Sequence, residues 1–178
     1  MRGVAVPLLT LSGRFFRAVL ADRVGDVLAP PGPASAGRYH RLGQPALYLT
    51  CDPEWARIAV SGYMREDGLA RVIVPLVLGP AHVVDQRDEA ACVALGIARA
   101  DSDANWRAAL AAGREPPSWR NADAARAIGA DGIIDRSRHI PEGWHVTLFR
   151  WNATGAPTLG VAGDPFPAIL SGSDQHWG

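Results

Sequence analysis

Hydrophobic and polar positions along the chain follow two periods, and each period predicts a different kind of element. Residues 13–20 alternate with a period of two, so Phe15, Arg17 and Val19 share one face of a predicted strand. Short apolar runs predict further strands at residues 46–50, 69–78, 132–135 and 144–151. Pro75 within one of these runs indicates a bulge or a sheet edge. The Pro- and Gly-rich stretch 29–37 is predicted to be a loop.

A helix is predicted to begin at the sequence Asp52-Pro-Glu, because Asp is a good cap, Pro fits the first helical position and Glu favours the positive helix end. Apolar residues at positions 55, 58, 59, 62 and 63 then mark one face that we expect to be buried. Other helices are predicted over residues 88–95 and 104–112, and from a cap at Asn121 to Gly129. The mixture of elements predicts an α+β fold.

The composition is that of one water-soluble domain. The chain has 178 residues with 18 basic and 18 acidic side chains, so no net charge attracts nucleic acid or anionic lipid. No run approaches the roughly 20 apolar residues of a membrane-spanning helix, and we expect a cytoplasmic protein. Cys51 and Cys92 are predicted to be reduced. The cysteines and histidines lack the spacing of a zinc site, so no metal is expected.

Three features of the sequence suggest chemistry. Arg17 lies on an apolar strand face, where we expect a pair with an internal carboxylate, a place at the sheet rim, or a cleft in which its guanidinium binds a phosphate with two hydrogen bonds. Arg38 lies in a segment bracketed by glycines, 37–43, that can bring backbone N–H groups and arginines to an anion. Ser137, flanked by arginines at a strand end, is a candidate nucleophile, ligand or simple cap. No GxSxG motif surrounds it.

Taken in order, these segments resemble the RES-domain family, the NAD⁺-degrading toxins of RES–Xre toxin–antitoxin systems. The resemblance covers about residues 13–155 of what we expect to be a single domain, 1–178, with a C-terminal extension, 156–178. It rests on an ordered set of motifs: Phe16-Arg17, Gly37-Arg38, Pro45-Ala-Leu-Tyr-Leu49, Asp52-Pro-Glu54, Pro117-Ser-Trp119, Ala122-Asp-Ala-Ala-Arg126, Gly129-Ala-Asp-Gly-Ile-Ile134, Ser137-Arg138 and Trp144-His-Val-Thr-Leu-Phe-Arg-Trp-Asn152.

The resemblance implies a compact fold like that of ADP-ribosyltransferases, and cleavage of NAD⁺ between nicotinamide and ribose. NAD⁺ is then a substrate and no cofactor is needed. The acceptor would be water (a glycohydrolase), phosphate (a phosphorylase) or a protein that receives ADP-ribose, and an Xre-type antitoxin would be the partner. Arg38 and Ser137 match the family's name-giving arginine and serine and are implied to be catalytic. Arg17, Arg38, Tyr48 and Ser137 are implied to bind NAD⁺, and we expect them around one cleft.

The family's glutamate is the one motif residue without a match. Alignment without gaps places Ala59 at its position on the helix, and Glu54 points about 140° away from it. A shifted alignment would bring Glu66 or Asp67 into the role. The alternative function is therefore a degenerate RES domain that binds a nucleotide or an antitoxin without efficient turnover.

Overall fold

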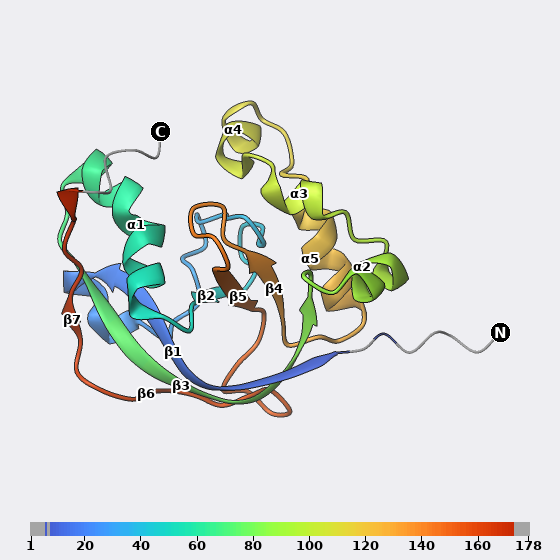
Figure 1. Ribbon diagram of the computed structural model, residues 1–178, viewed down its shortest axis with the longest axis horizontal. Coiled ribbons are helices and arrows are strands. Elements are labelled where there is room, and N and C mark those ends of the chain that lie inside the picture. Colours follow the sequence, from blue (N-terminus) through green and yellow to red (C-terminus); the bar gives the residue numbers. More distant parts are fainter. Residues whose placement is uncertain (1–5, 7, 173–178) are drawn as a thin grey trace.

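Strand β3 (Arg71–Asp85) pairs with four other strands and organises the sheet of the computed structural model, which describes residues 6 and 8–172 (Figure 1). The remaining strands are β1 (Leu9–Leu20), β2 (Leu47–Leu49), β4 (Gly132–Arg136), β5 (Trp144–Leu148), β6 (Leu159–Val161) and β7 (Phe166–Pro167). The helices are the 3-10 helix η1 (Ala21–Asp26) and the α-helices α1 (Pro53–Asp67), α2 (Glu89–Leu95), α3 (Arg99–Asp103), α4 (Trp106–Ala111) and α5 (Ser118–Ala127). The predicted α+β class is confirmed.

The strands form one mixed sheet in the order β1-β3-β4-β5-β2, with β6 and β7 paired to β3. Among the strands of the described residues, only β3 and β4 pair in parallel. The sheet curls until its two end strands meet, because Phe16 of β1 and Thr50, just after β2, exchange backbone hydrogen bonds of 2.7 and 3.0 Å. This closure brings Arg17 and Tyr48 to the same region of the molecule.

Buried side chains cover both faces of this sheet. Neighbouring residues of one strand point to opposite faces. Val83 and Ile134 therefore belong to the core inside the curled sheet, whereas Val84 and Ile133 pack toward α2 and α5. A third, small cluster around Ala56 attaches α1 to β3. Each fully buried aliphatic side chain of this kind contributes roughly 1.5–3 kcal/mol to folding, so the strands that carry the site are firmly placed.

Helix α1 begins where the sequence predicts, but it buries a different face. The Asp52 carboxylate accepts the N–H groups of Glu54 and Trp55, at 2.7 and 3.3 Å, and Gly68 ends the helix in the left-handed conformation. None of the five apolar positions predicted to be buried is buried. The helix instead packs through Ala56, with Met64 partly buried against the same cluster. The predicted face was wrong because periodicity locates an apolar stripe without showing whether core or cavity lies opposite.

Several further predictions need correction. Asn121 is not a helix cap: α5 begins at Ser118, and the Asn121 amide lies buried in a polar network. The predicted helix 104–112 corresponds to α4, which Asn105 caps, whereas α3, just before it, was not predicted. Pro75 lies inside β3 opposite Phe16, and the register shift lies between Leu11 and Gly13 instead. Strands β6 and β7 were not predicted.

Both cysteines are free thiols, as predicted. Within the described residues, no helix is both long and apolar enough to cross a membrane. Residues 173–178 of the expected C-terminal extension lie outside the described part of the chain.

Candidate active site

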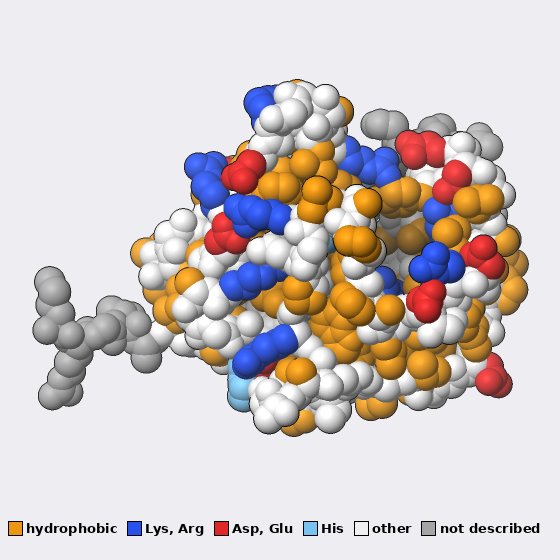
Figure 2. Space-filling view, turned by 180° about the vertical axis from the view of Figure 1, so that it is seen from behind, with side chains coloured by type: hydrophobic (Ala, Val, Ile, Leu, Met, Phe, Trp, Pro, Cys, Tyr) orange, Lys and Arg blue, Asp and Glu red, His pale blue; other side chains and the backbone are white. Residues whose placement is uncertain are grey.

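A cleft of about 810 Å³ opens between α1 on one side and the segments around Arg38, α4 and Ser137 on the other. Figure 2 shows a hollow on this face, with hydrophobic side chains inside it and Lys or Arg side chains near its rim. All four residues that the sequence assigned to a site lie on its walls: Arg17, Arg38, Tyr48 and Ser137. They come from four separate segments, which only the curled sheet brings together.

Arg17 reaches the cleft from the middle of β1, where it lies opposite Val74 of β3. One guanidinium N–H group, on Nη1, donates to the backbone carbonyl of Val27. Burial lowers the pKa of Arg17 to about 10, so the side chain still carries its charge at neutral pH. Arg17 therefore lines the cleft and at the same time has an internal partner, which is a backbone carbonyl and not a carboxylate.

Helix α5 holds the backbone of the segment 37–39 by three consecutive carbonyls. Trp119 Nε1 donates to the carbonyl of Gly37 at 2.8 Å, the Ser118 hydroxyl donates to that of Arg38, and Arg126 Nη2 donates to that of Tyr39 at 2.8 Å. These donors belong to the motifs 117–119 and 122–126. Their role in this structure is to fix the backbone that carries Arg38.

Arg38 and Arg138 converge on one backbone oxygen. Arg38 Nη1 lies 2.5 Å from the Ser102 carbonyl and 3.1 Å from that of Ala104, while Arg138 Nη1 lies 2.7 Å from the Ser102 carbonyl. Burial lowers the pKa of Arg38, and the neighbouring charge of Arg138 lowers it further. Two adjacent guanidinium groups repel each other, so an anion bound between them would relieve that repulsion.

Tyr48 is held in place by its hydroxyl, which accepts the N–H of Tyr39 at 3.1 Å and lies 2.9 Å from His40 Nδ1. Burial raises the pKa of Tyr48 and lowers that of His40, so both side chains are neutral at neutral pH. Gly37 completes the cluster. A Cβ atom on this residue would lie 2.4 Å from His40 Cε1 and 2.9 Å from the Tyr48 hydroxyl.

Ser137 organises the turn that follows β4. Its Oγ accepts the N–H groups of His139 and Ile140, at 3.2 and 3.1 Å. The hydroxyl proton is left to donate to a ligand in the cleft. The cap and ligand interpretations of Ser137 are therefore compatible. The nucleophile interpretation would require a base in contact with Oγ, and no side-chain base hydrogen-bonds to it among the described residues.

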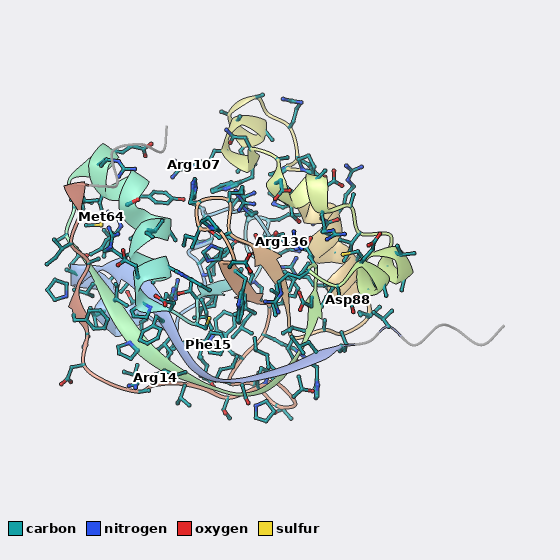
Figure 3. All side chains as sticks on the ribbon, in the orientation of Figure 1. Arg14, Phe15, Met64, Asp88, Arg107 and Arg136 are labelled. Atoms are coloured by element: carbon teal, nitrogen blue, oxygen red, sulfur yellow. The ribbon has the colours of Figure 1, made fainter. Side chains whose placement is uncertain are left out.

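The apolar stripe of α1 forms the opposite wall of the cleft. Ile58, Ala59, Gly62 and Tyr63 all line it, and Ala59 presents only a methyl group. Arg107 of α4 extends toward α1 (Figure 3), and its guanidinium carbon lies 4.1 Å from the centre of the Tyr63 ring. Of the two acids considered as replacements for the missing glutamate, Glu66 lines the cleft. Asp67 does not; it pairs with Arg71 at 2.7 Å.

The walls of the cleft carry more positive than negative groups, together with aromatic rings. Of the residues that the structure describes, five arginines and three carboxylates line it: Arg17, Arg38, Arg65, Arg107, Arg138, Glu66, Asp103 and Asp135. Arginine forks bind phosphate oxygens in pairs of hydrogen bonds, and rings stack on planar groups. The fold and the site together define an α+β protein with a binding cleft suited to a phosphate-bearing ligand that also contains planar rings.

The sequence model of the RES domain matches residues 14–171, so this chain belongs to the RES-domain family. The match extends past residue 155 and includes β6 and β7. Among solved structures, the crystal structure of the M. tuberculosis MbcT–MbcA toxin–antitoxin complex is similar in fold, with a TM-score of 0.61. The two sequences are 15% identical, and the similarity covers 90% of this chain and 86% of the other. A comparison with curated proteins finds no match.

Sequence reasoning missed several residues of the cleft, among them Tyr39, His40, Asp135 and His145. Asp135 carried a usable signal, because it lies at a strand end two residues before Ser137. His145 had none, since its place beside Asp135 follows from the pairing of β4 with β5.

Proposed function

We propose that this protein is an NAD⁺-cleaving toxin of the RES family, which releases nicotinamide by hydrolysis or phosphorolysis. The observation that carries this proposal is the convergence of Arg17, Arg38, Tyr48 and Ser137 on one cleft of about 810 Å³. Family membership supports the same reaction, and the cleft lies within the usual size range of small-molecule sites.

In this proposal the arginines hold the pyrophosphate and an aromatic ring covers the ribose or the nicotinamide. The bond between the ribose C1′ and the pyridinium nitrogen then breaks, and its electron pair leaves with the nitrogen to give neutral nicotinamide. The ribose carbon becomes oxocarbenium-like, as in glycoside hydrolysis. The Ser137 hydroxyl donates a hydrogen bond to a ribose or carboxamide oxygen and so orients the substrate.

A partner protein belongs to the same proposal. The similar fold of MbcT is known from a toxin–antitoxin complex, and a toxin that degrades NAD⁺ must be neutralised in the cell that makes it. We therefore propose an antitoxin, of the Xre type that the sequence resemblance implies, and a cytoplasmic site of action.

A second candidate function is nucleotide or antitoxin binding without efficient turnover. Ala59 favours it, because this residue lines the cleft where the resemblance implies a glutamate. Under this candidate the wild type binds NAD⁺ but releases no nicotinamide, and Ala59→Glu starts the release by stabilising the oxocarbenium-like state.

The deciding experiment incubates the purified protein with NAD⁺, with and without inorganic phosphate, and follows nicotinamide by chromatography. Arg38→Ala serves as the inactive control. We expect release by the wild type, with ADP-ribose or its 1″-phosphate as the second product. A mass increase of the protein would instead indicate ADP-ribose transfer. Binding by calorimetry without release supports the second candidate. The absence of both binding and release contradicts NAD⁺ cleavage and NAD⁺ binding alike, and leaves only antitoxin binding.

A further inference from the structure

Three carboxylates line the cleft, and they differ in how far they are withdrawn from solvent. The Glu66 side chain is 67% exposed and lies 3.7 Å from Arg107, and the Asp103 side chain is 64% exposed. The Asp135 side chain is only 6% exposed. Of these three acids, Asp135 is thus the one from which a bound substrate would exclude water. Without water, the electrostatic interaction between its carboxylate and the substrate would be stronger.

Asp135 lies in β4, on the wall opposite α1, directly across the ladder from His145 of β5. Its Oδ2 atom is 3.6 Å from Arg138 Nη2, a looser contact than a bidentate ion pair. The residue also lines a second cavity of about 260 Å³ behind the cleft, so it forms part of the partition between the two spaces. Its carboxylate is near Arg38 and Arg138 without being fully neutralised by either.

We propose that Asp135 supplies, from β4, the catalytic carboxylate that Ala59 cannot supply from α1. This inference rests on the proposed function. As the bond to nicotinamide breaks, the carboxylate stabilises the positive charge on the ribose ring. A water oxygen then bonds to C1′ and gives its proton to the Asp135 carboxylate, which returns it to solvent. The balance is NAD⁺ and water to ADP-ribose, nicotinamide and one proton.

The electrostatic surroundings of Asp135 suit this role. Burial raises its pKa to about 6, against the opposing effects of Arg138, Arg38 and a hydrogen bond with Tyr39. The carboxylate is therefore ionised at neutral pH and basic enough to accept a proton. The titratable and charged groups that face it are Arg38, Tyr39, Tyr48, Asp103, Arg138 and His145, and His139 in turn acts on His145.

The first test compares Asp135→Asn with Asp101→Asn, a control at a carboxylate that is also partly withdrawn from solvent, with its side chain 23% exposed, but that lines neither cavity. We expect Asp135→Asn to lower kcat for nicotinamide release about 100-fold, the effect of losing a charge-stabilising group. Its affinity for NAD⁺ in calorimetry should stay within about threefold, because the phosphate-binding arginines remain. Asp101→Asn should retain kcat within about threefold, because Asp101 lies outside the cleft.

The second test is the pH profile of kcat, which a purely structural role of Asp135 would not produce. We expect wild-type release to fall below an apparent pKa near 6, as Asp135 is protonated. His139→Gln and His145→Gln should keep this limb, because burial lowers the pKa of both histidines, that of His145 to about 4. The limb should vanish from the residual activity of Asp135→Asn.

The outcomes separate this inference from the proposed function. Equal release by the wild type and Asp135→Asn overturns the inference alone, and so does a wild-type profile without a limb between pH 5 and 7. The pH profile of the wild type tests the role of Asp135 even if the Asp135→Asn variant does not fold. A wild type that releases no nicotinamide overturns the proposed function, and the inference with it.

Discussion

At the scale of single residues, the cleft depends on arginines whose hydrogen bonds fix the direction of each guanidinium. One nitrogen of Arg38, Nη1, donates to the carbonyls of residues 102 and 104. Because the guanidinium is planar and rigid, these bonds also set the direction of its other N–H groups. The ability of Arg38 to bind an anion therefore depends on the geometry of its guanidinium as well as on its charge.

Arg38→Lys is therefore expected to weaken NAD⁺ binding about 10-fold or more, although the charge is kept. An ammonium cannot hold both carbonyls and a phosphate in the geometry of a planar fork. Calorimetry with NAD⁺ measures the change. Arg136→Lys is the control, because Arg136 lines the second cavity and not the cleft. Unchanged affinity in Arg38→Lys would remove Arg38 from the binding site.

At the scale of elements, the segment 37–41 is shaped by its neighbours rather than by its own propensity. Helix α5 binds three of its carbonyls, and Arg41 pairs with Asp123 of the same helix at 2.7 Å. The contact between Gly37 and the His40–Tyr48 pair then sets the position of the Tyr48 hydroxyl.

Gly37→Ala tests this arrangement. The added methyl group would meet the ring of His40, which is 3% exposed and cannot swing aside, so we expect a loss of about 1–3 kcal/mol in the free energy of unfolding. NAD⁺ affinity should fall more than about 10-fold, because Tyr48 and Arg38 shift together. Gly32→Ala is the control, since its Cβ would meet nothing within 4 Å. Wild-type affinity in Gly37→Ala would show that the site does not need this close packing.

At the scale of the whole molecule, a buried carboxylate that is only loosely paired costs stability. Burial raises the Asp135 pKa from 3.8 to about 6 in the folded state, so the folded protein binds this proton more tightly than the unfolded chain does. Stability from this group is therefore present below about pH 4 and is lost as pH rises through 6. A shift of this size corresponds to about 3 kcal/mol.

Asp135→Asn should consequently be more stable than the wild type at pH 7.5, by up to about 3 kcal/mol, and should lose this advantage near pH 4. Urea denaturation of both proteins at the two pH values measures the difference. Asp103→Asn, with its side chain largely exposed, should show little difference at either pH. An Asn variant less stable at pH 7.5 would mean that Asp135 contributes to folding through its contact with Arg138.

Much of this protein is determined locally by its sequence. The capping residues predicted the start of α1 at Pro53, and alternation predicted residues 13–20 of β1, which begins four residues earlier at Leu9. The ordered motifs identified the family and four residues that do line one cleft. Local signals suffice there because a cap or a period depends on residues within a few positions of one another.

The tertiary structure decided which apolar stripe lines a cavity and which charges meet. Ile58 and Tyr63 were expected on a buried helix face and instead form a cleft wall, because hydrophobicity does not record what lies opposite. Ala59 lines the cleft, as its match to the family's glutamate position implied. Arg38 meets the Ser102 carbonyl across 64 positions of sequence, and β4 places Asp135 beside them. Such neighbours depend on sheet closure and strand register, which are set by long-range hydrogen bonds and packing that no local pattern encodes.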